Sequence, residues 1–309
     1  RCKMCGYREP IANEEGLKKE DVFTLLGDAK ELGLQSIAFS GGEVLLRKDI
    51  YEIILYAKEL QVEEITVVTN GTLVNEENAQ KLVESGMTNV NISLEGIGEM
   101  NDYIRGEGTF NKIVNAINIF KKYEDMIKTT VNVVISKHNY QHILALTKFI
   151  YEELGVSYIT YSPLNTSMMG SNFALYSDKL VIRPEDIPSV KEEIEKVIVY
   201  TREKTGYFVP ESYLRRIPDY FEGKNIIPQK PCFVPSESCG IDSAGNVFPC
   251  WVEYRTAGNI TKESLKAIVA NEIYLSQCKA ALSQKCKGCL VSCYPSIHED
   301  NAREISDAV

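Results

Sequence analysis

The chain has 309 residues, of which 44% are apolar, and its formal net charge is −9 at pH 7. This length predicts one large domain and a smaller one, with ample apolar material for a core. An acidic chain does not suit a protein that follows nucleic-acid phosphates, and no apolar run reaches the ~18 residues of a membrane span. No signal-peptide pattern is present. We therefore expect a cytoplasmic protein that binds neither nucleic acid nor membranes.

In chain order, the first 160 residues alternate helical and extended patterns. Apolar residues at helical spacing predict helices around 22–32, 50–60 and 110–117. Gly33, Gly86 and Gly155 stand where the end of a helix favours a left-handed residue. Short β-rich runs predict strands at 35–39, 64–69, 89–94, 129–135 and 157–161.

Strands that alternate with helices at this spacing build a parallel sheet with right-handed crossovers. We expect one more strand before Arg1, which makes residues 1–205 an α/β domain, a partial (β/α)6 TIM-like barrel. Residues 206–230 contain prolines and are predicted to be a linker. Residues 231–309 are predicted to form a small cysteine-rich module of a β-hairpin and helices. In such a barrel the functional residues belong at the C-terminal ends of the strands.

Nine cysteines fall into two groups, separated by a long stretch that contains none. Two open the chain with C-x-x-C spacing and seven lie in its last quarter: Cys2 and Cys5, then Cys232, Cys239, Cys250, Cys278, Cys286, Cys289 and Cys293. The odd number and the uneven distribution argue against a secreted protein held by disulfides. They favour metal binding in a reducing cytoplasm.

Polar motifs follow three of the predicted strands. These are "SGGE" (40–43), "TNG" (69–71) and "SLEG" (93–96), the last of them followed by "YIRGEG" (103–108). Alone, each motif has a plain structural reading: a Gly-Gly turn, an Asn-Gly turn or a solvated surface arginine. Together they bring an acid for an amine, a Ser/Glu pair for hydroxyls and an arginine for a carboxylate to one mouth of the barrel. This set suits an amino-acid nucleoside ligand.

With these motifs in order, residues 1 to 165 resemble the radical S-adenosylmethionine (SAM) superfamily. "RCKMC" is similar to the tail of the C-x-x-x-C-x-x-C motif of that family. The resemblance implies that three cysteines hold a 4Fe–4S cluster and that SAM binds its fourth iron. Cys2 and Cys5 match the second and third cysteines, and the first would lie three residues before Arg1.

The resemblance also implies a role for each residue of the strand-end motifs. Gly41, Gly42 and Glu43 would hold the methionyl amine of SAM. Ser93 and Glu95 would lie near the ribose, and Arg105 near the carboxylate. The remaining candidates for cofactor binding are Met4, in the apolar position before the third cysteine, Asn70 and Leu164.

The tail contains a second group of candidate metal ligands. "CGIDSAGNVFPC" (239–250) predicts a hairpin with its turn at "SAGN". Folding it about Ala244 and Gly245 places Cys239 directly opposite Cys250, with Cβ atoms about 5 Å apart. The other candidate ligands are Cys232 upstream and, in "CKGCLVSC", Cys286, Cys289 and Cys293. This spacing is typical of iron–sulfur or zinc ligation.

Cys278 differs from the other tail cysteines because it falls in a helical pattern, and we expect it to pack as a small apolar residue. The tail as a whole resembles the SPASM/twitch extension of radical enzymes, whose hairpin ends in G-x-x-x-x-C, as Gly245 to Cys250 do. The resemblance implies at least one auxiliary 4Fe–4S cluster. The run after Cys286 is shorter than the full SPASM pattern.

The resemblance implies a radical enzyme that cleaves SAM reductively and removes a hydrogen atom from its substrate, with an electron donor such as flavodoxin or ferredoxin. Tails of this kind accompany peptide or protein modification, which we favour, and oxidation of small-molecule alcohols or sugars. A third alternative is a non-catalytic iron–sulfur electron-transfer or zinc-binding protein, which would leave the strand-end motifs unexplained. His138 and His142 are predicted to face solvent.

Overall fold

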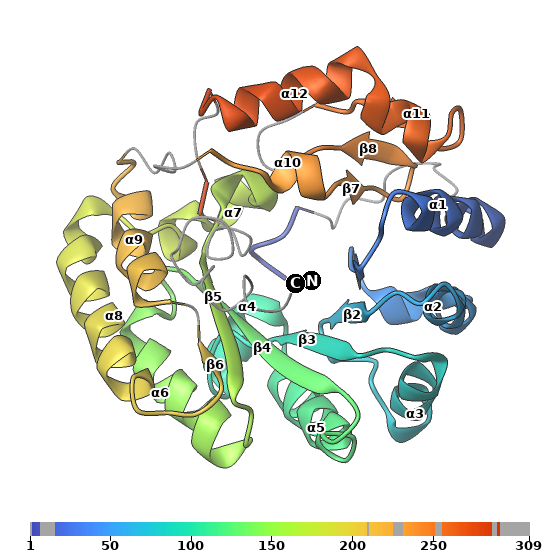
Figure 1. Ribbon diagram of the computed structural model, residues 1–309. Coiled ribbons are helices and arrows are strands. Elements are labelled where there is room, and N and C mark those ends of the chain that lie inside the picture. Colours follow the sequence, from blue (N-terminus) through green and yellow to red (C-terminus); the bar gives the residue numbers. More distant parts are fainter. Residues whose placement is uncertain are drawn as a thin grey trace.

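The computed structural model of the protein describes residues 2–6, 16–208, 210–224, 231–250, 255–285 and 289–290. Its centre is a parallel sheet that curves into a partial barrel (Figure 1). Six described strands pair in chain order, each parallel to the next. They are β1 (Ser36–Phe39), β2 (Glu64–Thr69), β3 (Asn89–Ser93), β4 (Lys128–Ile135), β5 (Tyr158–Pro163) and β6 (Tyr207–Phe208). The predicted α/β barrel is confirmed, and its five predicted strands coincide with β1 to β5.

Helices cover the outer face of this sheet (Figure 1). They are α2 (Ile50–Glu59), α3 (Glu76–Ser85), α5 (Thr109–Lys121), α6 (Ile143–Lys148) with the π-helical turn η3 (Phe149–Glu153), α8 (Ile187–Thr201) and α9 (Glu211–Phe221). The apolar stripe of α2, with Ile50, Ile53, Ile54 and Ala57, is buried as its spacing predicts. Gly86 ends α3 in the left-handed conformation, with φ +110°.

Short helices follow the C-terminal ends of the strands. They are η1 (Val44–Leu46) after β1, α4 (Glu99–Arg105) after β3, η2 (Tyr140–His142) after β4, and η4 (Thr166–Met169) and α7 (Asn172–Leu180) after β5, with η5 (Pro184–Asp186) before α8. These segments form the mouth of the barrel, where functional residues of parallel barrels lie.

The segment 206–230 is not a plain linker, because β6 and α9 lie within it. Strand β6 extends the sheet beyond β5, and α9 buries Tyr213, Leu214 and Ile217 in the main core. The linker prediction rested on prolines, but Pro218 lies inside α9 and is itself buried. The strand expected before Arg1 lies outside the chain and stays a prediction.

The C-terminal part forms a small module beside the barrel (Figure 1). It contains α10 (Val234–Glu237), β7 (Gly240–Ile241), β8 (Asn246–Phe248), β9 (Gly258–Asn259), α11 (Leu265–Ala270) and α12 (Glu272–Leu282). The three strands form an antiparallel sheet with its own apolar cluster. This cluster packs on Leu25 and Ala29 of α1 (Lys19–Glu31), and Asp28 of the same helix accepts a hydrogen bond from the backbone N–H of Leu265 at 2.9 Å.

None of the described helices combines the length and the apolar character that crossing a membrane requires.

Candidate functional site

The cysteine pair at the start of the chain is held at the mouth of the barrel. The backbone N–H of Lys3 donates to the carbonyl of Ile104 at the end of α4, and that of Gly6 to Met168 in η4, both at 2.8 Å. The N–H of Cys5 donates to the carbonyl of Cys2 at 3.4 Å, which closes one turn. Both thiols therefore lie in a single short loop, residues 2–6, which we call the cysteine loop.

The cysteine loop also contributes to an apolar cluster at the mouth. Met4 is 7% exposed and packs with Ile104, Leu164, Met169 and Leu180. Met4 and Leu164, two of the predicted cofactor-binding residues, thus lie in one cluster, although they are far apart in the sequence. They are apolar neighbours of the cysteine loop.

The glycine motif after β1 borders open space. A Cβ atom built on Gly41 or Gly42 would have no neighbour within 4 Å, so a ligand can approach this backbone closely. Glu43 is the N-cap residue of η1, and its carboxylate accepts hydrogen bonds from the hydroxyl of Thr69 at 2.8 Å and the N–H of Asn70 at 2.9 Å. Glu43 therefore joins the C-terminal ends of β1 and β2.

Asn70 behaves as a turn residue. Its side-chain oxygen accepts from the backbone N–H of Thr72 at 2.9 Å and from the hydroxyl of Thr72 at 2.5 Å. Gly71 follows with φ +73°. These bonds form the Asn-Gly turn that the sequence offered as the structural alternative, and a role of Asn70 in cofactor binding stays a prediction.

The motif after β3 contains Ser93, Glu95 and Arg105, and the last two form an ion pair. Ser93 is half-buried at the last position of β3. Glu95 has no exposed surface, and its Oε1 accepts from Nη2 of Arg105 at 2.5 Å and from Nε at 3.2 Å. Its Oε2 accepts from the N–H of Val134 on β4 at 2.7 Å. A solvated surface arginine, the structural alternative for Arg105, is thus excluded.

Two residues that the sequence analysis did not single out hold Glu95 in place. Asn101 of α4, which is fully buried, accepts from the N–H of Glu95 at 3.1 Å. Asn139 donates to the carbonyl of Glu95 and to that of Val134, both at 2.9 Å. Neither asparagine belongs to a recognisable motif, because each acts through a contact that depends on the tertiary fold.

Charge links Arg105 to the cysteine loop. Burial raises the pKa of the Cys2 thiol, and the nearby guanidinium of Arg105 opposes this rise. A positive charge beside a thiol favours its thiolate form, which is the form that binds a metal.

The hairpin of the C-terminal module has a different register from the predicted one. Gly240 pairs with Phe248, and continuing this register places Cys239 across from Pro249. Cys250 lies one residue further along. The prediction that Cys239 and Cys250 are directly opposite is therefore wrong by one residue, although both cysteines stay at the same end of the hairpin.

The physical reason lies in the turn. Oδ1 of Asp242 accepts from the N–H of Ala244 at 3.0 Å and from that of Asn246 at 2.9 Å, and Gly245 has φ +85°. This is a three-residue connection that ends in a left-handed glycine, whereas the prediction assumed a two-residue connection. The extra residue shifts the pairing by one.

The candidate metal ligands that the structure describes in the tail are half-buried. Cys239 and Cys250 lie at one end of the hairpin, Cys232 precedes α10, and burial raises the pKa of Cys239. Cys289 lies near Tyr220 of α9, whose pKa is raised by burial and then by this thiol. Cys286 and Cys293 lie outside the described residues. Within the described part of the chain, no three potential ligands gather into a metal site.

Cys278 is buried in the apolar cluster of the module, as its place in a helical pattern predicts. Its Sγ donates to the carbonyl of Pro235 at 3.1 Å, which ties α12 to α10.

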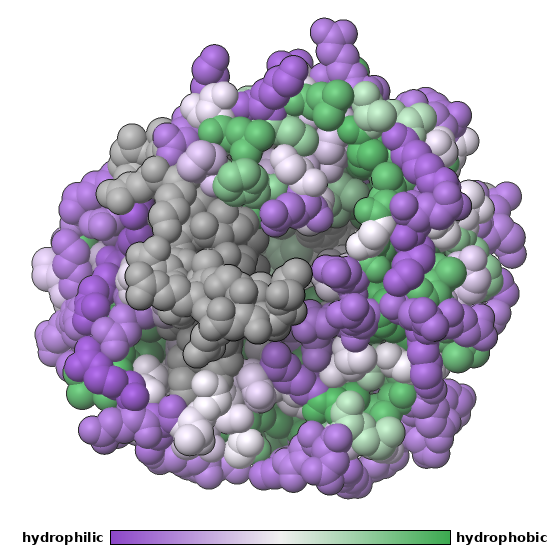
Figure 2. Space-filling view, in the orientation of Figure 1, coloured by the Kyte–Doolittle hydropathy of each residue, from purple (hydrophilic) through white to green (hydrophobic). Residues whose placement is uncertain are grey.

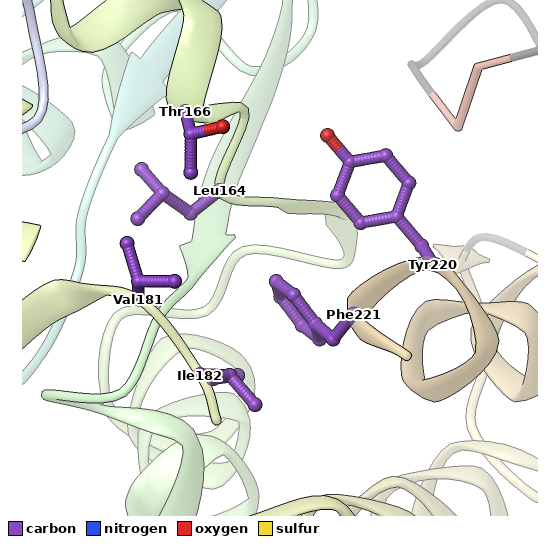
Figure 3. A pocket seen from close by; sticks show the side chains of 6 residues that line it. All are labelled: Leu164, Thr166, Val181, Ile182, Tyr220 and Phe221. Atoms are coloured by element: carbon purple, nitrogen blue, oxygen red, sulfur yellow. The ribbon is translucent and has the colours of Figure 1, made fainter. Parts of the chain in front are cut away.

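A pocket of about 200 Å³ opens beyond the end of β5 (Figure 3). Leu164 and Thr166 line it from the connection after β5, and Phe221 from the end of α9; Val181, Ile182 and Tyr220 complete the lining. Leu164 belongs to the cluster that contains Met4, Phe221 packs against this cluster, and Tyr220 lies near Cys289. The lining of the pocket therefore borders both the apolar cluster of the cysteine loop and Cys289.

Exposed apolar side chains surround the mouth of the barrel. Figure 2 shows hydrophilic side chains over much of the periphery, and apolar ones beside the hollow between the barrel and the C-terminal module. Leu46 follows β1 with 72% of its surface exposed, and Leu73 and Ile97 follow β2 and β3 with 42% and 43% exposed. Apolar side chains exposed together at a mouth are typical of a binding surface.

Comparison with known proteins extends these observations. The family profile described as the Radical SAM superfamily matches residues 1–150, and that described as an iron–sulfur cluster-binding domain (SPASM) matches residues 232–290. A curated relative, the Fe-coproporphyrin III synthase of Methanosarcina barkeri, is 31% identical over 188 residues, 59% of this chain and 46% of that protein. A probable GTP 3′,8-cyclase of Saccharolobus islandicus is 28% identical over 217 residues, 69% of this chain and 66% of that protein. The chain thus spans less than two thirds of the length of these curated relatives.

Solved structures with the same fold cover nearly the whole chain. The structure of anSMEcpe with bound AdoMet aligns with a TM-score of 0.67 and 19% identity, over 97% of this chain and 88% of that one. SuiB of Streptococcus suis bound to S-adenosylmethionine aligns with a TM-score of 0.69 and 20% identity, over 93% of this chain and 69% of that one.

Proposed function

Because the chain belongs to the radical SAM superfamily and carries a SPASM domain, we propose that it is an enzyme that modifies a peptide or protein by radical chemistry. Its cofactors are 4Fe–4S clusters and SAM. Bound at the mouth of the barrel, they would supply the one-electron chemistry needed to remove a hydrogen atom from an unactivated C–H bond. The chain itself would bind and orient SAM and the substrate and would exclude water from them.

The residues at the mouth fit these cofactors. Cys2 and Cys5 would bind cluster iron, because both lie in one turn beside the charge of Arg105. Gly41, Gly42 and Glu43 would receive the amine, because the glycines border open space next to an acid. Arg105 would meet the carboxylate of SAM and Ser93 its ribose. The carboxylate of Glu95 accepts hydrogen bonds from Arg105 and from the backbone of Val134, which supports a role in orienting Arg105.

The tail would hold the auxiliary cluster through Cys232, Cys239, Cys250, Cys286, Cys289 and Cys293. This assignment is supported by the match of residues 232–290 to a cluster-binding domain. A protein donor of single electrons, flavodoxin or ferredoxin in type, would reduce the clusters.

The observation that carries the choice of a peptide substrate is the likeness of the whole chain to two enzymes with peptides in their structures. anSMEcpe is known with the Kp18Cys peptide, and SuiB with its precursor peptide SuiA. The exposed apolar side chains of Leu46, Leu73 and Ile97 add support, because they offer a peptide a surface to bind around the mouth.

A small-molecule substrate is the second candidate. The curated relatives, which are more similar in sequence than these structures, are named for an iron porphyrin and for the nucleotide GTP. A radical dehydrogenase of an alcohol or sugar would likewise act on a small molecule.

The experiment is anaerobic reconstitution with iron and sulfide, followed by reduction with dithionite in the presence of SAM. Formation of 5′-deoxyadenosine is expected, and its absence at full iron content would reject radical SAM chemistry. Peptides encoded beside the gene are then compared with alcohols and sugars. An increase in 5′-deoxyadenosine with a peptide, together with a mass change of that peptide, would support the first candidate, whereas an increase only with a small molecule would support the second.

A further inference from the structure

Asn172 is a buried asparagine whose side chain faces the cysteine loop. It is the first residue of α7, and it is 4% exposed. Its Nδ2 lies 2.7 Å from the carbonyl oxygen of Cys5 and 3.4 Å from that of Cys2. An amide nitrogen carries two protons, so one side chain can donate to both carbonyls. Asn172 thus bonds the backbone of both cysteines that flank Lys3 and Met4.

The same part of the structure touches the loop a second time. A Cβ atom built on Gly6 would lie 2.9 Å from both Cα and N of Gly170, two residues before Asn172. The two backbones are therefore in direct contact, and the N–H of Gly6 donates to the carbonyl of Met168, two residues before Gly170. The cysteine loop is fixed on this side by a close glycine contact and by the amide of Asn172.

A bond from Asn172 to both cysteines restrains their relative position. The amide can satisfy both carbonyls only while the loop keeps its one-turn shape, which sets the spacing of the two Cα atoms that carry the thiols. If the loop were distorted, the buried amide of Asn172 would lose its two acceptors. Unsatisfied buried donors cost free energy, so the contact disfavours distorted shapes of the loop. This is how residues behind metal ligands act: they orient the ligands without touching the metal.

We propose that Asn172 is a positioning residue for the cluster that binds to Cys2 and Cys5. It holds the two cysteines in the geometry that the cluster requires, and the contact of Gly6 with Gly170 supports it. The inference rests on the proposed function only in that Cys2 and Cys5 bind iron.

The test measures the release of iron to a chelator from the reconstituted full-length protein. The release phase that disappears in Cys2→Ala belongs to the cluster of the cysteine loop. Asn172→Ala and Asn172→Asp are expected to speed this phase by about 10- to 100-fold, the usual effect of removing a residue behind a metal ligand. Asp has the same shape as Asn but cannot donate, so it should be no better than Ala. The iron that does not depend on Cys2 should stay as in the wild type.

The matched control is Asn165→Ala. Asn165 lies in the same connection, but its side-chain oxygen accepts from Ser167, at 3.0 Å from the backbone N–H and 2.7 Å from the hydroxyl. This variant should release iron at the wild-type rate. The EPR spectrum of the reduced cluster gives a second readout, because a displaced loop should weaken the change that SAM induces in it, whereas general destabilisation would leave it intact.

If the Asn172 variants fail to fold, Gly6→Ala perturbs the same contact from the other side and should speed the same phase. The inference would be overturned if the Asn172 variants released iron at the wild-type rate and gave wild-type EPR spectra, or if Asn165→Ala accelerated the release equally. Either result would leave the proposed function intact. A wild-type protein without any iron that depends on Cys2 would reject the proposed function, and the inference with it.

Discussion

The guanidinium of Arg105 is bound by the carboxylate of Glu95, with Nη2 2.5 Å from Oε1, in a place where Glu95 is fully buried and the side chain of Arg105 is 13% exposed. The second carboxylate oxygen binds the backbone of β4. This pair therefore connects three segments at the mouth of the barrel: the end of β3, α4 and β4. It also fixes the direction in which Arg105 points.

Glu95→Gln should destabilise the protein strongly. It leaves the buried guanidinium of Arg105 without its counter-charge, and removing one partner of a buried ion pair typically lowers the free energy of unfolding by about 3–5 kcal/mol. Urea unfolding measures the difference. The control is Glu77→Gln, which breaks the exposed pair with Lys81 on α3 and should leave the unfolding midpoint unchanged. Equal midpoints for the two variants would contradict a structural role of the Glu95–Arg105 pair.

Glu43→Ala should weaken the binding of SAM. If its carboxylate receives the amine at the mouth, the loss of one charge-assisted hydrogen bond lowers the affinity by roughly tenfold to a hundredfold. Calorimetric titration of the reconstituted protein gives the dissociation constant. Glu64→Ala is the comparison, because Glu64 is exposed at the opposite, N-terminal end of β2. An affinity for SAM that is the same in both variants would remove Glu43 from the site.

The sequence predicted those features that follow from local patterns. The strands β1 to β5 were predictable because apolar runs, helix-ending glycines and helical spacing recur between residues 33 and 161. The clustering of the strand-end motifs followed in turn, because the C-terminal ends of parallel strands meet at one mouth.

The features that were missed depend on single residues or on distant contacts. Strand β6 has two described residues, too few for a periodic pattern. Helix α9 was missed because it contains Pro218, and proline favoured a linker prediction. The register of the tail hairpin depended on whether three residues or two form its turn. Asn139 holds Glu95 across 44 positions of the chain, and no local pattern encodes such a contact.

His138 was predicted to face solvent, but its ring stacks on that of Tyr103 with centroids 4.2 Å apart. The ammonium group of Lys3 lies over the same Tyr103 ring, with Nζ 3.2 Å from its centroid. Burial and the charge of Lys3 lower the pKa of His138 below its ordinary value of 6.5, and His142 adds to this effect.

This shift predicts a dependence of stability on pH. Between the lowered pKa of folded His138 and about 6.5, the unfolded state binds more protons than the folded state, so stability falls as the pH drops through this window. His138→Phe keeps an aromatic ring against Tyr103 but cannot titrate, and it should reduce the loss of stability between pH 7 and pH 5.5. Urea unfolding at the two pH values is the measurement. The same loss in the variant and in the wild type would contradict the prediction.

Cys250 and Cys278 are predicted to have different roles in the C-terminal module: Cys250 binds the auxiliary cluster, and Cys278 packs as an apolar residue. Cys250 lies at the end of the hairpin with Cys239, whereas Cys278 is buried in the apolar cluster and bonded to Pro235. Cys250→Ala should lower the auxiliary iron content, and because thiolates gathered closely repel each other without a metal, it should also loosen residues 232–293 while the barrel still folds. Cys278→Ala should keep all its iron and lower the free energy of unfolding by on the order of 1 kcal/mol, as expected for a small buried group. Iron per chain after reconstitution and proteolysis of the module measure these effects. Full iron in Cys250→Ala, together with a loss in Cys278→Ala, would reverse the assignment of ligands.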